Sequence, residues 1–146
     1  MLLFHVAGKP IPQGSKRHVG NGRFIEASKY LPAWRKAVTA KAQAVAIASD
    51  WQTTDGPVQV HLDFYMPRPK SVPLHVRPFM TKMPDLDKLV RAVCDGLTDA
   101  GIWEDDAQVI RLIARKDYAD NDEPGVDIQV TRLEQVDDDV RGEVLL

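Results

Sequence analysis

The chain has 146 residues, of which 44% are hydrophobic and 27% charged, a composition that predicts one soluble globular domain with a sizeable core. No apolar run is long enough to cross a membrane, and the apolar first residues lack the basic flank of a signal peptide. The single cysteine, Cys94, excludes an intramolecular disulfide and a cysteine-based zinc site, so the cytoplasm is the expected compartment.

The net charge of −2 hides an uneven distribution of charge along the chain. Residues 1–43 contain eight lysines and arginines against one acid, Glu26, whereas residues 117–146 contain ten acids against two arginines. The basic part favours contact with nucleic-acid phosphates despite the acidic total. A charged helix face and a solvated tail would give the same pattern, so charge alone leaves both interpretations open.

The first third of the chain predicts a strand, a loop and a helix. Apolar residues alternate over residues 2–7, which indicates the strand. Residues 8–27 are rich in glycine and proline and are expected to form a loop with a hairpin turn at residues 20–22. Ser28 is expected to begin the helix, with Pro32 in its first turn.

The rest of the chain predicts three strands and a second helix. Strict alternation marks a strand over residues 58–66, and four prolines make residues 67–83 an irregular loop. A second helix is expected over residues 86–99, with an apolar stripe facing the core. Two shorter alternating runs, 110–114 and 126–130, predict the last strands.

This order of elements predicts an α+β fold in two layers. The simplest arrangement packs both helices on one face of a small mixed sheet of about four strands. We expect one domain over residues 1–134, followed by an acidic C-terminal tail over residues 135–146.

Four aspartates flank the second predicted helix: Asp85 and Asp87 at its entrance, and Asp105 and Asp106 after its end. Helix capping explains one carboxylate at the entrance, and turn formation is the usual role of an aspartate pair before a strand. Chain reversal after the helix could bring both pairs to the same end of the fold. Carboxylates gathered there repel one another without a cation, which favours Mg²⁺ or Mn²⁺ in phosphate chemistry.

The same segment resembles the signature of the RusA family of Holliday-junction resolvases, approximately K-x-P-D-L-D-N-L-x-K, then D-x-L, then G-x-W-x-D-D-x-Q-V. The matching residues are Lys82, Pro84, Asp85, Leu86, Asp87, Leu89, Asp95, Leu97, Gly101, Trp103, Asp105, Asp106, Gln108 and Val109. The resemblance implies a compact homodimer of phage or bacterial type. It also implies a Mg²⁺-dependent endonuclease that resolves four-way DNA junctions during recombination and repair, with no organic cofactor and no membrane partner.

The resemblance implies catalytic, metal-binding roles for Asp85, Asp87 and Asp106, with Mn²⁺ as a possible substitute for Mg²⁺. Asp105 is expected to support them as a ligand or as a hydrogen-bond partner. Arg91 stands where the family has a lysine. An arginine can stabilise a phosphate-centred transition state, but it cannot give up its proton. Lys88 stands where the family has an asparagine.

A weaker resemblance covers the N-terminal loop and helix, where a basic loop is expected to contact the DNA backbone, because phosphate contacts need only positive charge. The predicted DNA-binding residues are Lys16, Arg17, Arg23, Lys36, Lys82 and Lys88.

Two rival functions stay open at this point. The first is a junction-DNA-binding protein without cleavage, against which the retained aspartates argue. The second is a nuclease acting on flaps or other branched DNA, and no residue pattern separates it from a junction resolvase.

Overall fold

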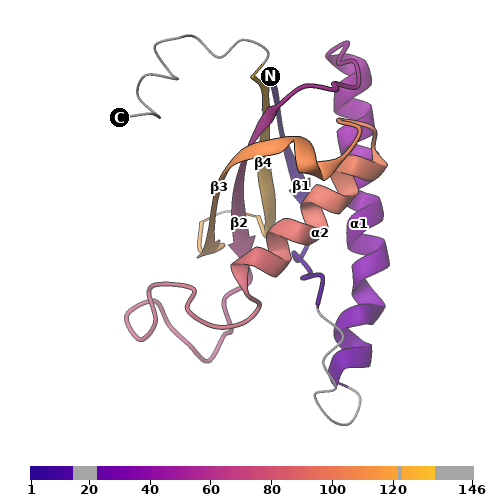
Figure 1. Cartoon of the computed structure of the whole chain (residues 1–146). Helices are drawn as coiled ribbons and strands as arrows, with labels where there is room; N and C mark the ends of the chain where they lie inside the picture. Colours follow the sequence, from indigo (N-terminus) through magenta and orange to yellow (C-terminus); the bar gives the residue numbers. More distant parts are fainter. Residues whose placement is uncertain (15–22, 122, 134–146) are drawn as a thin grey trace.

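The computed structural model shows one four-stranded sheet with both helices on the same face (Figure 1). It describes residues 1–14, 23–121 and 123–133, with residues 23–28 described by their backbone. The elements in chain order are β1 (Leu2–Ala7), α1 (Arg23–Ala48), β2 (Val58–Met66), α2 (Leu86–Asp99), the short 3-10 helix η1 (Asp106–Gln108), β3 (Val109–Tyr118) and β4 (Gly125–Arg132). The predicted α+β fold is therefore confirmed. The tail expected over residues 135–146 lies outside the described residues.

The sheet is mixed, with the strand order β1-β4-β2-β3. β4 is antiparallel to both of its neighbours, whereas β2 and β3 are parallel and are joined through α2. A parallel pair requires such a crossover, because a short turn cannot return the chain to the same end of the sheet. β1 and β3 are thus the two edges of the sheet.

The core lies between the sheet and the two helices. Every second residue of β2, from Val58 to Met66, is buried, and the residues between them are half-buried on the other face. Trp34 and Val38 of α1 and Leu89 of α2 are buried in the same cluster. The strict alternation of β2 therefore predicted both the strand and the face that carries the core.

α1 differs from the helix expected from the sequence. It begins at Arg23 rather than at Ser28, so Pro32 lies inside the helix and not in its first turn. Residues 23–25, expected to be the returning half of a hairpin, are helical, and the predicted turn lies outside the described residues. Most of α1 is rich in alanine, the strongest helix former, and Pro32 is exposed, so the ring does not disturb the core.

The two helices approach each other closely at Gly96. A Cβ at this position would lie 2.9 Å from Cγ1 of Val38, so a larger residue would separate the helices. The Thr39 hydroxyl donates to the Gly96 carbonyl at 2.9 Å, and Arg35 pairs with Asp99 at 2.7 Å. These contacts fix α2, which carries much of the candidate site. In the described part of the chain, no helix combines the length and apolar character needed to span a bilayer.

Gly125 begins β4 with a positive φ of 155°, and a side chain there would collide with the Val6 carbonyl and lie 2.7 Å from His5 Nε2. We expect Gly125→Ala to lower the free energy of unfolding by roughly 2 kcal/mol or more, because both the backbone conformation and the space require glycine. Urea unfolding followed by circular dichroism measures this loss. Gly14→Ala is the control, since a Cβ there meets no atom within 4 Å. Equal stability of the two variants would contradict the prediction.

Candidate active site

Asp85 occupies the N-cap of α2, yet its side chain makes no capping hydrogen bond. The carboxylate is 55% exposed and lies 3.6 Å from Lys88 Nζ, one turn into the helix. Asp87 follows in the first turn and is also exposed. Helix capping therefore does not account for the Asp85 side chain, and both carboxylates are accessible to a ligand.

The backbone before Asp85 is held by β3. The Lys116 ammonium donates to the carbonyls of Lys82 and Pro84, at 2.7 Å each. These two bonds fix the end of the 67–83 loop against the sheet where it enters α2. Lys116 was not predicted as a site residue. The one feature of the sequence that could have indicated this role is that Lys116 is a charged residue on the helix-facing side of a strand.

Three charged residues follow one face of α2 at intervals of four residues: Asp87, Arg91 and Asp95. Residues at this spacing are neighbours on a helix surface. Asp95 is half-buried, whereas Asp87 and Arg91 are exposed. Asp95 matched the family signature but was not predicted as a site residue. The spacing from Arg91 was the signal that could have identified it.

The turn after α2 positions Asp105 and Asp106 firmly. Trp103 is 1% exposed, and its indole N–H donates to the Thr98 hydroxyl at 2.7 Å. The Gln108 side-chain oxygen accepts from the backbone N–H groups of Glu104 and Asp105, at 2.8 and 2.9 Å. Its amide nitrogen donates to the carbonyls of Thr54 and Gly56. Gln108 thus ties this turn to the segment before β2, a role that the sequence did not reveal.

Asp105 caps η1 and also contacts Asp106. Its carboxylate accepts the Ala107 N–H at 2.9 Å, and this bond, together with a hydrogen bond from Asp106, lowers the pKa of Asp105. The pKa of Asp106 is raised, first by the same hydrogen bond, then by burial and by the negative charges of Asp105 and Asp95. The charge of Arg91 opposes that rise in the pKa.

Asp105 and Asp106 share a hydrogen bond in the turn, and the charges of Arg91 and Asp95 on α2 act on the pKa of Asp106. Cys94 is buried in the core, as predicted, and its burial, reinforced by the charges of Asp106 and Asp95, raises its pKa to about 12. Asp85 and Asp87 lie at the N-terminal end of the same helix. Among the described residues, no three His, Cys, Asp or Glu side chains form a ready-made metal cluster.

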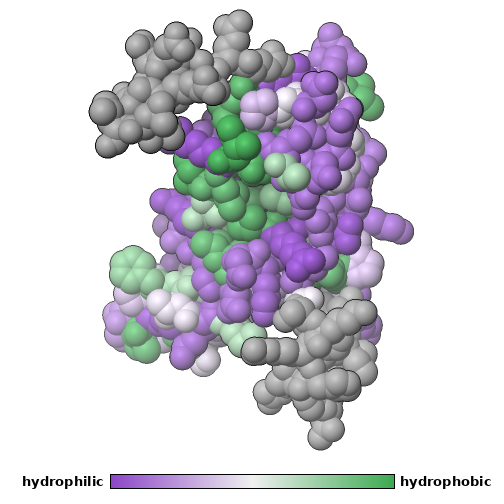
Figure 2. Space-filling view, viewed as in Figure 1, coloured by the Kyte–Doolittle hydropathy of each residue, from purple (hydrophilic) through white to green (hydrophobic). Residues whose placement is uncertain are grey.

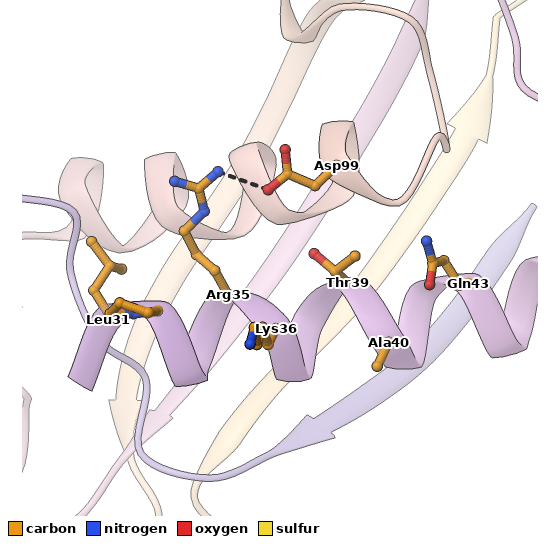
Figure 3. A pocket seen from close by; sticks show the side chains of 8 residues that line it. Leu31, Arg35, Lys36, Thr39, Ala40, Gln43 and Asp99 are labelled. Atoms are coloured by element: carbon orange, nitrogen blue, oxygen red, sulfur yellow. Dashed lines mark hydrogen bonds and ion pairs between the residues drawn. The ribbon is translucent and has the colours of Figure 1, made fainter. Parts of the chain in front are cut away.

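The predicted DNA-binding residues occupy different places. Lys88 and Lys82 flank Asp85, and Lys82 is exposed. Lys36 instead lines an open groove of about 590 Å³ on the surface of α1, where Arg35 reaches Asp99 (Figure 3). Asp99, the residue of α2 that lines this groove, ends the helix and lies roughly 20 Å along it from Asp85.

The basic loop is described only in part. Lys16 and Arg17 lie outside the described residues, and Arg23 begins α1. The Gln13 N–H donates to the Lys88 carbonyl at 3.0 Å. The chain therefore enters the basic loop from a point fixed beside the first turn of α2.

This fold presents a row of carboxylates and one arginine along α2 and the turn that follows it, an arrangement suited to the class of enzymes that cleave phosphate esters. Residues 7–131 match the protein family described as Endodeoxyribonuclease RusA, and the match covers α1, β2, α2 and β3 in full. The chain belongs to this endodeoxyribonuclease family, which confirms the resemblance seen in residues 82–109.

A curated relative matches most of the chain. The chain is 32% identical over 148 aligned residues to a protein of Bacillus subtilis (strain 168) described as "Uncharacterized protein YqaN". The alignment covers 90% of this chain and 96% of that protein.

Proposed function

We propose that this chain is a Mg²⁺-dependent endodeoxyribonuclease that resolves four-way DNA junctions by paired incision in recombination and repair, acting as a homodimer. Family membership supplies the class of reaction. The observation that carries the proposal is the crowding of carboxylates around Asp106, with only Arg91 as a nearby positive charge among the groups that shift its pKa. Neighbouring carboxylates repel one another when ionised, and a bound cation would relieve this repulsion. Such crowding therefore favours a cation at this site.

The donor set fits Mg²⁺, with Mn²⁺ as a substitute, because it consists of carboxylate oxygens. We assign the metal to Asp85, Asp87 and Asp106 because the family signature places its metal ligands there and because Asp85 does not cap the helix. Among the described residues these three carboxylates do not meet in one cluster, so holding a single ion would require them to move together. A bound ion of this kind polarises a phosphate oxygen and makes a coordinated water more acidic.

The protein's own groups have separate tasks in this proposal. Asp105 orients the Asp106 carboxyl through their shared hydrogen bond. Arg91, on the exposed face of α2, offers a permanent positive charge to the phosphate under attack. Lys82 and Lys88 lie beside Asp85 and would hold the flanking DNA backbone. Gln108 and Lys116 position the two acidic segments through backbone bonds.

A panel of labelled substrates tests this function. The purified protein is incubated with a four-way junction, a flap and a linear duplex of the same sequence, with Mg²⁺ or with EDTA. We expect cleavage of the junction with Mg²⁺ and none with EDTA. Preferred cleavage of the flap would show that the substrate is a flap and not a four-way junction. Junction binding without cleavage in any divalent metal would overturn the enzymatic proposal.

DNA binding is expected to weaken steeply with salt through the basic N-terminal part. Replacing Lys16, Arg17 and Arg23 by alanine should flatten the plot of log affinity against log salt, by about 0.9 for each phosphate that the protein no longer neutralises. Titration of labelled junction with protein at several salt concentrations measures the slope. Lys41→Ala is the control, because Lys41 is exposed on α1 but is not a predicted DNA-binding residue. An unchanged slope in the triple variant would remove the basic loop from the DNA interface.

A further inference from the structure

The loop between β2 and α2 exposes several large apolar side chains next to the candidate active site. Leu74, Val76 and Phe79 are 57%, 64% and 71% exposed, and Met83 is 79% exposed. Figure 2 shows apolar residues on the projecting part of the molecule where Figure 1 draws this loop. Large apolar side chains concentrated in one exposed segment of a small domain indicate a surface that binds another molecule.

Side-chain contacts hold the loop against the sheet although it is exposed. Arg68, at its beginning, donates to both carboxylate oxygens of Asp120, at 2.6 and 3.0 Å, and to the Arg77 carbonyl at 2.7 Å. The Arg68 guanidinium also stacks on the Tyr118 ring, 4.0 Å from its centroid, and Arg77 Nε donates to the Tyr118 hydroxyl at 2.6 Å. Because Tyr118 ends β3 and Asp120 follows it, these contacts fasten the loop to the end of that strand.

Further contacts hold the residues around Phe79. Met80 is half-buried and packs against the hydrophobic core, whereas Phe79 beside it is exposed. The Thr81 N–H donates to the Phe79 carbonyl at 2.9 Å, which closes a tight turn. Beyond this turn, the Lys82 carbonyl accepts from the Lys116 ammonium. The Phe79 ring is therefore presented to solvent by a backbone that is held in place.

The charges of the loop indicate a nucleic-acid ligand. Residues 67–83 contain four lysines and arginines and no aspartate or glutamate. Arg68 and Arg77 are used in the contacts with β3, whereas Lys70 and Lys82 are exposed. An exposed aromatic ring beside lysines is the combination that binds single nucleotides, because the ring stacks on a base and the lysines attract phosphates. An apolar segment of another protein would not require a surface without acids.

We propose that Phe79 stacks on a base whose face is exposed at a DNA branch point, and that this contact favours branched DNA over continuous duplex. Phe79 precedes Asp85 by six residues, so their Cα atoms lie at most roughly 22 Å apart. This distance corresponds to about six nucleotides of a stacked strand, at about 3.4 Å each. The ring therefore reaches bases close to a phosphate that is held at Asp85.

This contact rests on the proposed function for its substrate, and deepens it by naming a group that distinguishes a branched strand from a duplex. Phosphates are present in both forms of DNA, so lysines and arginines bind both. In a continuous duplex each base is stacked on both faces, and no face is open to an aromatic ring. Loss of the Phe79 ring should therefore weaken binding to a branched DNA and leave binding to a duplex unchanged.

Binding of labelled DNA to the full chain in EDTA tests this contact without cleavage. Phe79→Ala should raise the Kd for a four-way junction roughly five- to 150-fold and leave the Kd for a duplex of the same sequence unchanged. Phe79→Leu keeps an exposed apolar side chain without a ring, so it should lose affinity as Phe79→Ala does, whereas Phe79→Trp should bind as the parent protein does. Parent affinity in Phe79→Ala or Phe79→Leu, or an equal loss for junction and duplex, would overturn the inference.

A photochemical cross-link provides a second readout. A junction with 5-iodouracil at the bases beside the branch point is irradiated with the bound protein, and the modified peptide is identified by mass spectrometry. We expect a cross-link at Phe79 with the junction and none there with the duplex. Cross-links at other residues only, or none, would overturn the inference. A Phe79→Ala variant that binds and cuts the junction as the parent protein does would reject the inference alone. Junction binding that depends on Phe79, without cleavage in any divalent metal, would reject the proposed function alone.

Discussion

Replacing Asp106 by asparagine is expected to abolish cleavage of a four-way junction while leaving junction binding intact. The change removes one negative charge from the cluster with Asp105 and Asp95 and alters the shape of the side chain little. Loss of a group that holds the metal costs transition-state stabilisation of about 4 kcal/mol, which corresponds to a rate roughly 10³-fold lower. Single-turnover cleavage of labelled junction gives the rate, and an electrophoretic shift without metal gives the affinity.

Glu104→Gln is the matched control for this experiment. Glu104 lies two residues away, is exposed, and contributes only its backbone N–H to the turn. The control loses the same charge from the same segment, so its cleavage rate should stay close to that of the parent protein. Full activity in Asp106→Asn would remove Asp106 from the site. If both variants lost cleavage rate equally, the effect would come from the loss of negative charge in this segment and not from a specific role of Asp106.

The second large effect is expected for Trp103→Ala, in the free energy of unfolding. Trp103 is among the largest fully buried side chains and donates to the Thr98 hydroxyl at 2.7 Å. Truncation of a buried tryptophan creates a cavity and costs about 3–5 kcal/mol. Because Trp103 holds the turn that carries Asp105 and Asp106, junction cleavage should also fall at temperatures where the variant is still folded. Urea unfolding and cleavage assays at low temperature measure the two effects.

Trp103→Phe separates packing from the hydrogen bond. It retains most of the apolar volume and loses the indole N–H, so we expect a smaller loss of roughly 1–2 kcal/mol. If Trp103→Ala unfolded at the same urea concentration as the parent protein, Trp103 would not anchor the turn.

Local patterns were enough to predict the main elements of the fold. β2 and α2 could be predicted because the apolar residues of each repeat with the period of their structure. The predicted beginning of α1 was wrong. Gly20, Asn21 and Gly22 are typical of a hairpin turn, so the residues after them were expected to form a strand, whereas α1 begins at Arg23. β3 continues to Tyr118, beyond the predicted end, because pairing with β2 supports residues that do not alternate on their own.

The sequence predicted part of what is proposed as the candidate site. The two aspartate pairs could be recognised in the sequence. The distance between the pairs depends on how the turn after α2 packs, which no local pattern indicates. Gln108 and Lys116 act through backbone carbonyls that are remote in sequence, so residue type alone gave no sign of their roles. The spacing of Asp95 from Arg91 was a signal in the sequence, but the effect of Asp95 on the pKa of Asp106 depends on how the turn packs against α2.

The most direct test of the proposed function is to map the incisions that the unmodified protein makes in a four-way junction labelled in turn on each strand, with Mg²⁺ present. A metal-dependent dimeric resolvase should make two cuts, at symmetric positions on opposed strands, which disappear when EDTA replaces Mg²⁺. An intact junction under both conditions, or cuts that persist in EDTA, would contradict the proposed function.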